Sequence, residues 1–259
     1  LDAGALRRAV EQAAPEVVVH ELTALPDRFD RRRSDIYDAT NRIRDEGTRN
    51  LLEAARAAAA RRFVCQSIAF AYAPGPRPEV KDEDAPLNLG APPPFAEGVR
   101  VIGEMERAVL DADGFEGLVL RYGWLYGPGT YYAQNGSTAQ EVRRRRFPVI
   151  GSGAGLFSFV HVDDAADATV AAVQRGAPGV YNVVDDEPAA MRDWLPAYAE
   201  AIGARRPLRI PVWLARLAAG KMAAAVNLQP GASNAKAKSE LGWEPRWRSW
   251  REGFREAPR

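Results

Sequence analysis

Apolar runs and stretches of helical periodicity alternate along this chain. The apolar runs predict strands buried on both faces, because such strands lack polar alternation; they cover residues 16–20, 63–67, 118–120 and 180–184. The periodic stretches predict helices; they cover residues 3–14, 48–60, 96–112, 165–174 and 192–202. This alternation predicts an α/β protein with a doubly wound, right-handed parallel sheet.

The stretch from Leu118 to Gly129 is the centre of the predicted site. It begins as a buried strand, and Arg121 ends the apolar run. Tyr126-Gly-Pro-Gly129 then forces a turn, because Pro fixes φ and Gly permits positive φ. Ligands of open α/β sheets bind beyond the carboxyl ends of strands. Residues 121–129 are therefore predicted to form a wall of the site.

Several charged residues have structural explanations. Asp2 is a plausible N-cap for the first helix, and Asp163 and Asp164 are predicted to cap helix 165–174. The run Arg143–Arg146 ends a short helix, where the helix dipole favours cations. For this run we favour a solvated face over a phosphate clamp.

Composition excludes several classes of function. The formal net charge is +1, so we expect no nucleic-acid or membrane partner. The single cysteine, Cys65, cannot form an internal disulfide and fits a reducing compartment. The two histidines lie too far apart in sequence to suggest a metal site, and no apolar run reaches 18 residues. The chain is predicted to be a cytoplasmic protein without a metal.

A series of motifs is spread over nearly the whole chain. The motifs are His20 to Ala24, Gly47-Thr48-x-Asn50-Leu-Leu-Glu-Ala-Ala55, Leu120-Arg121, Tyr126-Gly-Pro-Gly129, Phe159-Val-His-Val-Asp-Asp164, Val180-Tyr-Asn-Val183 and Lys236-Ala-x-x-x-Leu241-Gly-Trp-x-Pro245. Together, in this order, they resemble one family, the extended short-chain dehydrogenases/reductases, in their NAD-dependent epimerase/dehydratase branch.

The resemblance implies a Rossmann-like sheet with a small C-terminal substrate lobe. We divide the chain into a dinucleotide-binding domain, residues 1–165, and a region completing the sheet and forming the lobe, residues 166–259. Three tryptophans, Trp243, Trp247 and Trp250, are predicted to pack inside this lobe rather than to form a platform on which nucleic-acid bases stack. The resemblance also implies two βα units before Leu1, about 60 residues at about 30 residues per unit, which would include a glycine-rich loop. An upstream in-frame stop with no glycine-rich segment would refute this expectation.

The family's binding positions can be carried over one by one, and imply NAD or NADP as cofactor. The cofactor-binding candidates are Leu22, Thr23, Ala24, Gln66, Tyr122, Gly123 and Trp124. The substrate candidates are Trp124, Tyr126 and Phe157. Phe157 stands where many relatives place an Arg that pairs with a nucleotide-sugar diphosphate. We therefore predict a small substrate with apolar surface that is not a nucleotide sugar.

The family's catalytic groups are missing. It uses a Ser/Thr and a Tyr-x-x-x-Lys, in which Lys lowers the Tyr pKa. The Ser/Thr position holds Ile68, with Ser67 beside it. Gly98 and Ile102, or in another register Ala96 and Arg100, take the Tyr and Lys positions. The substitute catalytic candidates are Ser67 and a Tyr122 whose pKa is lowered by Arg100.

Three functions remain open at this point. The first is an NAD(P)-dependent epimerase/dehydratase/reductase-like oxidoreductase. The second is a non-redox cyclase or isomerase on the same fold, and the third is a catalytically silent dinucleotide-binding protein. A small-molecule substrate and a homodimer formed through helices 48–60 and 96–112 are expected; Leu51 and Leu52 make the first helix suited to close packing.

Overall fold

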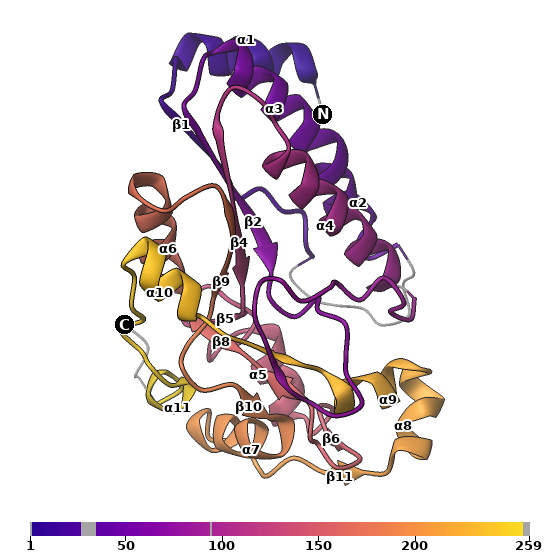
Figure 1. Cartoon of the computed structure of the whole chain (residues 1–259). Helices are drawn as coiled ribbons and strands as arrows, with labels where there is room; N and C mark the ends of the chain where they lie inside the picture. Colours follow the sequence, from indigo (N-terminus) through magenta and orange to yellow (C-terminus); the bar gives the residue numbers. More distant parts are fainter. Residues whose placement is uncertain (1, 27–34, 94, 256–259) are drawn as a thin grey trace.

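Four parallel strands form the central sheet of the computed structural model, which describes residues 2–26, 35–93 and 95–255 (Figure 1). They lie in the order β1-β2-β4-β9. Their bounds are β1 Val17–His20, β2 Arg62–Ile68, β4 Glu116–Tyr122 and β9 Gly179–Val183. The predicted α/β class and Rossmann-like parallel sheet are confirmed. Among the described residues, no helix is both long and apolar enough to cross a membrane.

Helices cover both faces of the sheet (Figure 1). One face packs against α1 (Ala3–Ala13), α3 (Thr48–Ala57) and α4 (Phe95–Leu110). The other packs against α6 (Val162–Gln174) and α10 (Ala235–Leu241). Strand side chains alternate between the faces: in β4, Val119 packs towards α3 and α4, while Leu118 and Leu120 pack towards α6. Burial on both faces explains why this strand is apolar throughout.

The segment before α3 is helical and continuous with it. It comprises α2 (Asp38–Arg42) and the π-helix η1 (Ile43–Gly47). The ring of His20, at the end of β1, is buried and lies 3.0 Å from the Thr48 hydroxyl at the start of α3. Burial lowers the pKa of His20, so the ring is neutral there. This contact fixes the start of α3 against the carboxyl end of β1.

Short strand pairs and helices build a second body below the sheet in Figure 1, the lobe. Its strand pairs are β5 (Trp124–Tyr126) with β8 (Phe159–His161), β7 (Leu156–Phe157) with β10 (Ala189–Ala190), β6 (Val149–Ile150) with β11 (Arg209–Ile210), and β3 (Val80–Lys81) with β12 (Gly231–Ala232). Its helices are α5 (Ser137–Arg143), α7 (Met191–Ala201), α8 (Val212–Ala219), α9 (Met222–Ala225), η2 (Val226–Leu228) and α11 (Trp250–Gly253).

The lobe has an aromatic core of its own. Trp194 from α7 is fully buried among aromatic rings that include Phe159, with ring centroids 5.2 Å apart. This core also takes in Tyr132 and Phe157. A domain boundary at residue 165, drawn from the sequence, therefore does not coincide with the packing. The chain enters the lobe, returns to the sheet at β9 and enters the lobe again.

The three predicted lobe tryptophans have different neighbours. Trp250 packs in the lobe core as predicted. Trp243 instead packs among sheet and α6 residues, and its indole N–H donates to the Asp164 carbonyl at 3.0 Å. Trp247 lies on the His161 ring, with centroids 3.7 Å apart. These tryptophans bind the C-terminal segment to both bodies.

The two aspartates lie in the first turn of α6 and do not cap it. The helix begins at Val162, and His161 is its N-cap residue, with Nδ1 accepting from the Asp163 N–H at 3.2 Å. The Asp164 carboxylate accepts the backbone N–H groups of Arg246 and Trp247 at 2.9 and 3.1 Å. Asp164 is thus held by a segment more than 80 residues away, which local spacing could not show.

The arginine run after α5 is exposed along its whole length, from Arg143 to Arg146. Arg143 donates to the Gln134 and Ile202 carbonyls, and Arg144 lies 3.7 Å from Glu141. These contacts agree with the predicted solvated face at a helix end.

Candidate functional site

The carboxyl ends of three neighbouring strands meet at one edge of the sheet. After β1, the Leu22 carbonyl accepts from the Gln66 side-chain amide at 2.9 Å. The Tyr122 hydroxyl, at the end of β4, donates to Glu21 Oε1 at 3.0 Å. Residues predicted from separate parts of the sequence are thereby brought to one place, where an open α/β sheet binds its ligand.

The segment Leu22–Ala24 follows β1 without regular secondary structure and is exposed. Leu22 is 60% exposed, and the Ala24 N–H donates to the Thr40 hydroxyl at 3.1 Å. Thr40 and Gln66 hold the backbone of this segment in place. The exposed Leu22 side chain could then pack against a flat ring of a dinucleotide.

Tyr122 is buried against the α6 side of the sheet. Its hydroxyl lies 2.7 Å from Thr169 Oγ1 and 3.0 Å from Glu21 Oε1. Burial, and after it the Glu21 carboxylate, raise the pKa of Tyr122 well above its ordinary value. A general base needs the opposite shift, so the structure gives Tyr122 a role in packing and hydrogen bonding.

Arg100 cannot lower that pKa, because it lies on the other side of the sheet. It is exposed on α4, and its guanidinium pairs with Glu97 and Glu104, with 2.5 Å between Nη1 and Glu104 Oε1. Tyr122 faces α6, whereas α4 covers the opposite face. The structure therefore does not bring the sequence-predicted pair together.

Glu21 was not singled out by the sequence. The residue is exposed overall, but burial of its carboxyl group raises its pKa to about 7, partly offset by the hydrogen bond from Tyr122. The carboxyl can therefore hold or release a proton near neutral pH at the sheet edge. A carboxylate directly after the apolar strand Val17–His20 was the signal available in the sequence.

Ser67 belongs to a buried polar network beneath α4. Its hydroxyl donates to Glu106 Oε1 at 2.6 Å, and the serine is 3% exposed. The Arg121 guanidinium makes two bonds to Glu106, at 2.9 and 2.6 Å. Arg121 also donates to the Tyr72 hydroxyl at 2.8 Å, which in turn donates to Asn182 Oδ1 at 2.6 Å. The Ser67 hydroxyl is thus engaged inside the protein.

The structure shows which candidates on α4 face the interior. Gly98 and Ile102 are buried, whereas Arg100 is exposed and Ala96 is half-buried. Of the two candidate pairs, Gly98 and Ile102 therefore face inward, and neither side chain can transfer a proton. Ile68 packs nearby against an apolar group that includes Val99.

Aromatic rings gather where β4 passes into the lobe. Trp124 stacks on Phe70, with centroids 4.0 Å apart and planes 15° apart. Phe157 approaches Trp124 at 5.5 Å, so two predicted substrate residues are neighbours. The third, Tyr126, is 1% exposed and packs in the lobe core. Trp124 Nε1 is buried and finds no acceptor among the described residues.

Gly123 allows the chain to turn from β4 into β5. A Cβ there would lie 2.4 Å from the Ser158 carbonyl oxygen, closer than any side chain tolerates. Its role is therefore close backbone packing, which places Trp124 beside Phe157.

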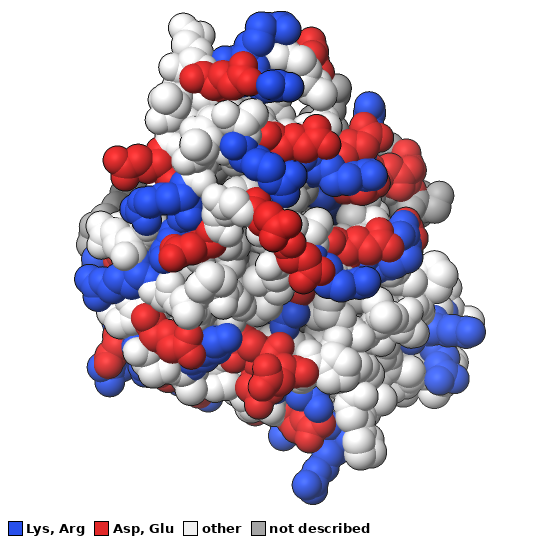
Figure 2. All heavy atoms as spheres, turned by 45° about the horizontal axis from the view of Figure 1, so that its top comes forward, with Lys and Arg blue, Asp and Glu red and all other residues white. Residues whose placement is uncertain are grey.

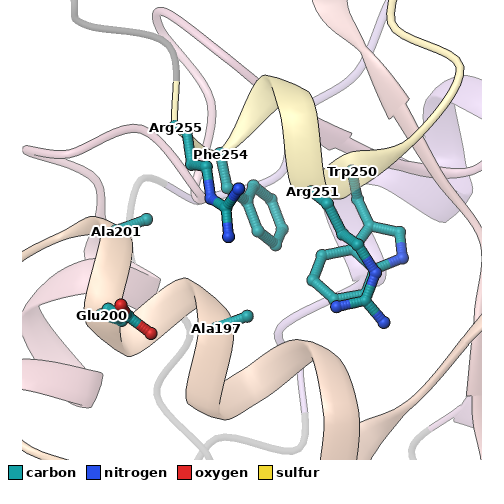
Figure 3. Close-up of a pocket in the computed structure, with 7 residues that line it drawn as sticks. All are labelled: Ala197, Glu200, Ala201, Trp250, Arg251, Phe254 and Arg255. Carbon is teal, nitrogen blue, oxygen red and sulfur yellow. The ribbon is translucent and has the colours of Figure 1, made fainter.

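A pocket of about 270 Å³ lies elsewhere, between α7 and α11 of the lobe (Figure 3). Glu200 faces it from α7, and Trp250, Phe254 and Arg251 from α11 and the residues after it. None of the sequence-predicted site residues lines it.

Comparison with known proteins decides the family. The model of the NAD dependent epimerase/dehydratase family matches residues 1–183. The chain belongs to this family. A curated protein from Streptomyces sp, named 3-diazoavenalumate denitrifying reductase, is 51% identical over 256 residues, covering 98% of this chain and 83% of that protein.

A second curated relative comes from Stigmatella aurantiaca. It is named 4-hydroxy-2-methyl-3-oxo-4-farnesyl-3,4-dihydroquinoline-1-oxide ketoreductase and is 32% identical over 178 residues, which cover 67% of this chain and 52% of that protein. The predicted NAD(P)-dependent epimerase/dehydratase/reductase-like enzyme is confirmed by this family and these reductases.

Solved structures confirm the fold. The UDP-glucose 4-epimerase of Thermotoga maritima with UDP-glucose superposes with a TM-score of 0.75 at 20% identity, covering 98% of this chain and 79% of that one. A human epimerase family protein with NADPH has a TM-score of 0.72 at 21% identity, covering 95% and 84%.

Proposed function

We propose that this family member is a nicotinamide-dependent reductase that removes dinitrogen from a diazo compound, the kind of reaction for which its Streptomyces relative is named. One observation carries the proposal: the inward-facing candidates for the family's Ser/Thr, Tyr and Lys positions are Ile68, Gly98 and Ile102, none of which is a proton-transfer group. An apolar wall stands where proton-transfer groups would be, so the reaction should need no proton from them.

Reduction of a diazonium group meets this requirement. A bound NAD(P)H would supply a hydride. The diazonium carbon–nitrogen bond breaks, N2 leaves, and the net change is R–N2⁺ plus hydride giving R–H plus N2, with two electrons gained by the substrate. General acid–base help is typically worth about 10²- to 10⁴-fold, and this reaction does not need it.

The chain's own residues would bind and orient the reactants. Leu22, Thr23, Ala24, Gln66 and Gly123 are proposed to hold the cofactor at the ends of β1, β2 and β4, with Tyr122 packed below them. Trp124 and Phe157 are proposed to hold a flat substrate, with Tyr126 supporting them from the lobe core. Such apolar walls exclude water from the reacting group.

An isotope experiment tests the reaction. With NAD(P)H deuterated at the transferring position and 3-diazoavenalumate in ordinary water, we expect one deuterium in each product and one N2 per cofactor oxidised. Mass spectrometry of the product and of the headspace gas measures both. Deuterium entering from D2O instead, or cofactor oxidation without N2, would contradict the proposal.

The substrate is further proposed not to be a nucleotide sugar. Phe157 is 5% exposed and packs between Trp124 and Trp194, so no cation takes that position. The arginine run of α5 is exposed and held by carbonyls and Glu141. We also propose that the protein is cytoplasmic, because its cysteine, Cys65, is a free, buried thiol, which fits a reducing compartment.

We also propose a two-fold homodimer through α3 and α4. Leu51 and Leu52 pack in the chain's own core, so they cannot form the contact. The contact with the second copy is instead proposed at a groove of about 220 Å³ between η1, α3 and α4, whose walls include Met105 and Ala108. Light scattering is expected to show a dimer at micromolar concentration and a monomer for Ala108→Arg. A monomeric parent protein would refute this interface.

A further inference from the structure

Asn41 is a buried amide with an unused hydrogen-bonding atom. It lies on α2 and is 9% exposed, and its Oδ1 has no donor among the described residues. Its neighbour Thr40 uses its hydroxyl to accept the Ala24 N–H. A buried acceptor without a donor is unfavourable, so such an atom is expected to be met by a ligand or water.

Gly98, on the neighbouring helix α4, faces this atom. A Cβ at Gly98 would meet a single described atom within 4 Å, Asn41 Oδ1 at 3.7 Å, which is an ordinary contact. Gly117 differs, because a Cβ there would lie 2.2 Å from a carbonyl oxygen. Nor is Gly98 among the residues of positive φ. Neither crowding nor backbone conformation requires glycine here, although glycine weakens a helix interior.

We propose that Gly98 and Asn41 form the closed end of a substrate subsite. A flat aromatic ring would lie against the Gly98 backbone, and a hydroxyl or N–H of the same molecule would donate to Asn41 Oδ1. Ile68, Phe95 and Val99 pack together beside Gly98 and give this end an apolar wall. The inference rests on the proposed function and specifies its substrate class as an aromatic compound with a hydrogen-bond donor.

Binding of a matched pair of probes, 4-hydroxycinnamate and 4-methoxycinnamate, tests this subsite on the intact protein. The two share a ring, but only the first carries a donor. We expect Asn41→Leu to weaken 4-hydroxycinnamate about tenfold and to leave 4-methoxycinnamate unchanged. Asn41→Asp retains an acceptor and should restore binding of the hydroxyl probe. Calorimetry measures both affinities without turnover.

Gly98 variants provide the second arm. Gly98→Ala should raise Tm by a few degrees through helix propensity, yet weaken both probes several-fold because its Cβ occupies the subsite. Gly98→Leu should abolish binding of both. Gly4→Ala, in the exposed helix α1, is the control: it should raise Tm and leave both affinities unchanged.

The outcomes separate this inference from the proposed function. Equal affinity of Asn41→Leu and the parent protein for 4-hydroxycinnamate, unchanged affinity of Gly98→Ala, or no binding of either probe by the parent protein would overturn the subsite. Failure to release N2 in the isotope experiment would overturn the function while leaving the binding results standing.

Discussion

Replacing Glu106 with alanine is expected to lower the free energy of unfolding by about 3–5 kcal/mol, because it leaves the charge of Arg121 buried without a partner. Both side chains are about 5% exposed, and two hydrogen bonds join them under α4. Urea unfolding followed by circular dichroism measures the change. The Ser67 hydroxyl would lose its acceptor at the same time, whereas Tyr72, which accepts from Arg121, would keep its own partners.

Two variants make this result specific. Arg100→Ala removes ion pairs to Glu97 and Glu104 on the exposed side of the same helix and should have little effect. The double variant Glu106→Leu with Arg121→Met removes both charges and should recover much of the lost stability. If Glu106→Ala and Arg100→Ala lowered the free energy of unfolding by the same amount, the buried Glu106–Arg121 pair would not be a main contributor to stability. Figure 2 shows Lys and Arg side chains interspersed with Asp and Glu side chains over the upper part of the visible surface.

Replacing Trp124 with alanine is expected to reduce kcat/KM for the aromatic substrate roughly thirtyfold. Loss of its ring contacts should cost about 2 kcal/mol of substrate binding. The Tm should fall only modestly, because Trp124 is partly exposed and Phe157 keeps its contacts with Trp194. Steady-state kinetics and calorimetry of NAD(P)H binding separate the two effects; cofactor affinity should be unchanged.

Trp213→Ala is the matched control. Trp213 lies on α8 and is 67% exposed, so its loss should leave kcat/KM unchanged. Trp124→Phe keeps an aromatic ring but removes the indole N–H, and should fall between the parent protein and the alanine variant. A full-activity Trp124→Ala protein would exclude this ring from the substrate site.

The sheet could be predicted because each of its strands is a continuous run of mostly apolar residues in the sequence. Glu116–Tyr122 is apolar where both faces of the sheet are covered. Val17–His20 is equally apolar, although Val19 is 41% exposed, so its burial on both faces was over-predicted. The prediction that Arg121 ends the buried run was wrong, because β4 continues to Tyr122 and Arg121 is only 5% exposed. Its partner, Glu106, lies on the preceding helix, and only the packing of that helix on the strand reveals the pair.

The site was only partly predictable for the same reason. Trp124 and Phe157 were found from family positions, and the structure makes them neighbours. The pairing of Tyr122 with Arg100 failed because the sequence allowed two registers of α4 and did not reveal which face of the sheet each residue takes. By spacing, Arg44 takes the family's Asn position and Asn41 lies a turn earlier; the sequence could not show that Asn41 approaches Gly98, because that distance depends on how α2 and α4 pack.

Cys65 gives this molecule a built-in reporter of core opening. It is the single cysteine of the chain, lies in the middle of β2, and has no exposed surface. Its side chain packs in the core between the sheet and helices α3 and α4. Burial raises the pKa of its thiol, so the reactive thiolate is scarce in the folded protein. A thiol reagent can therefore react only when these helices move away from the sheet, and the labelling rate measures how often that core opens under native conditions.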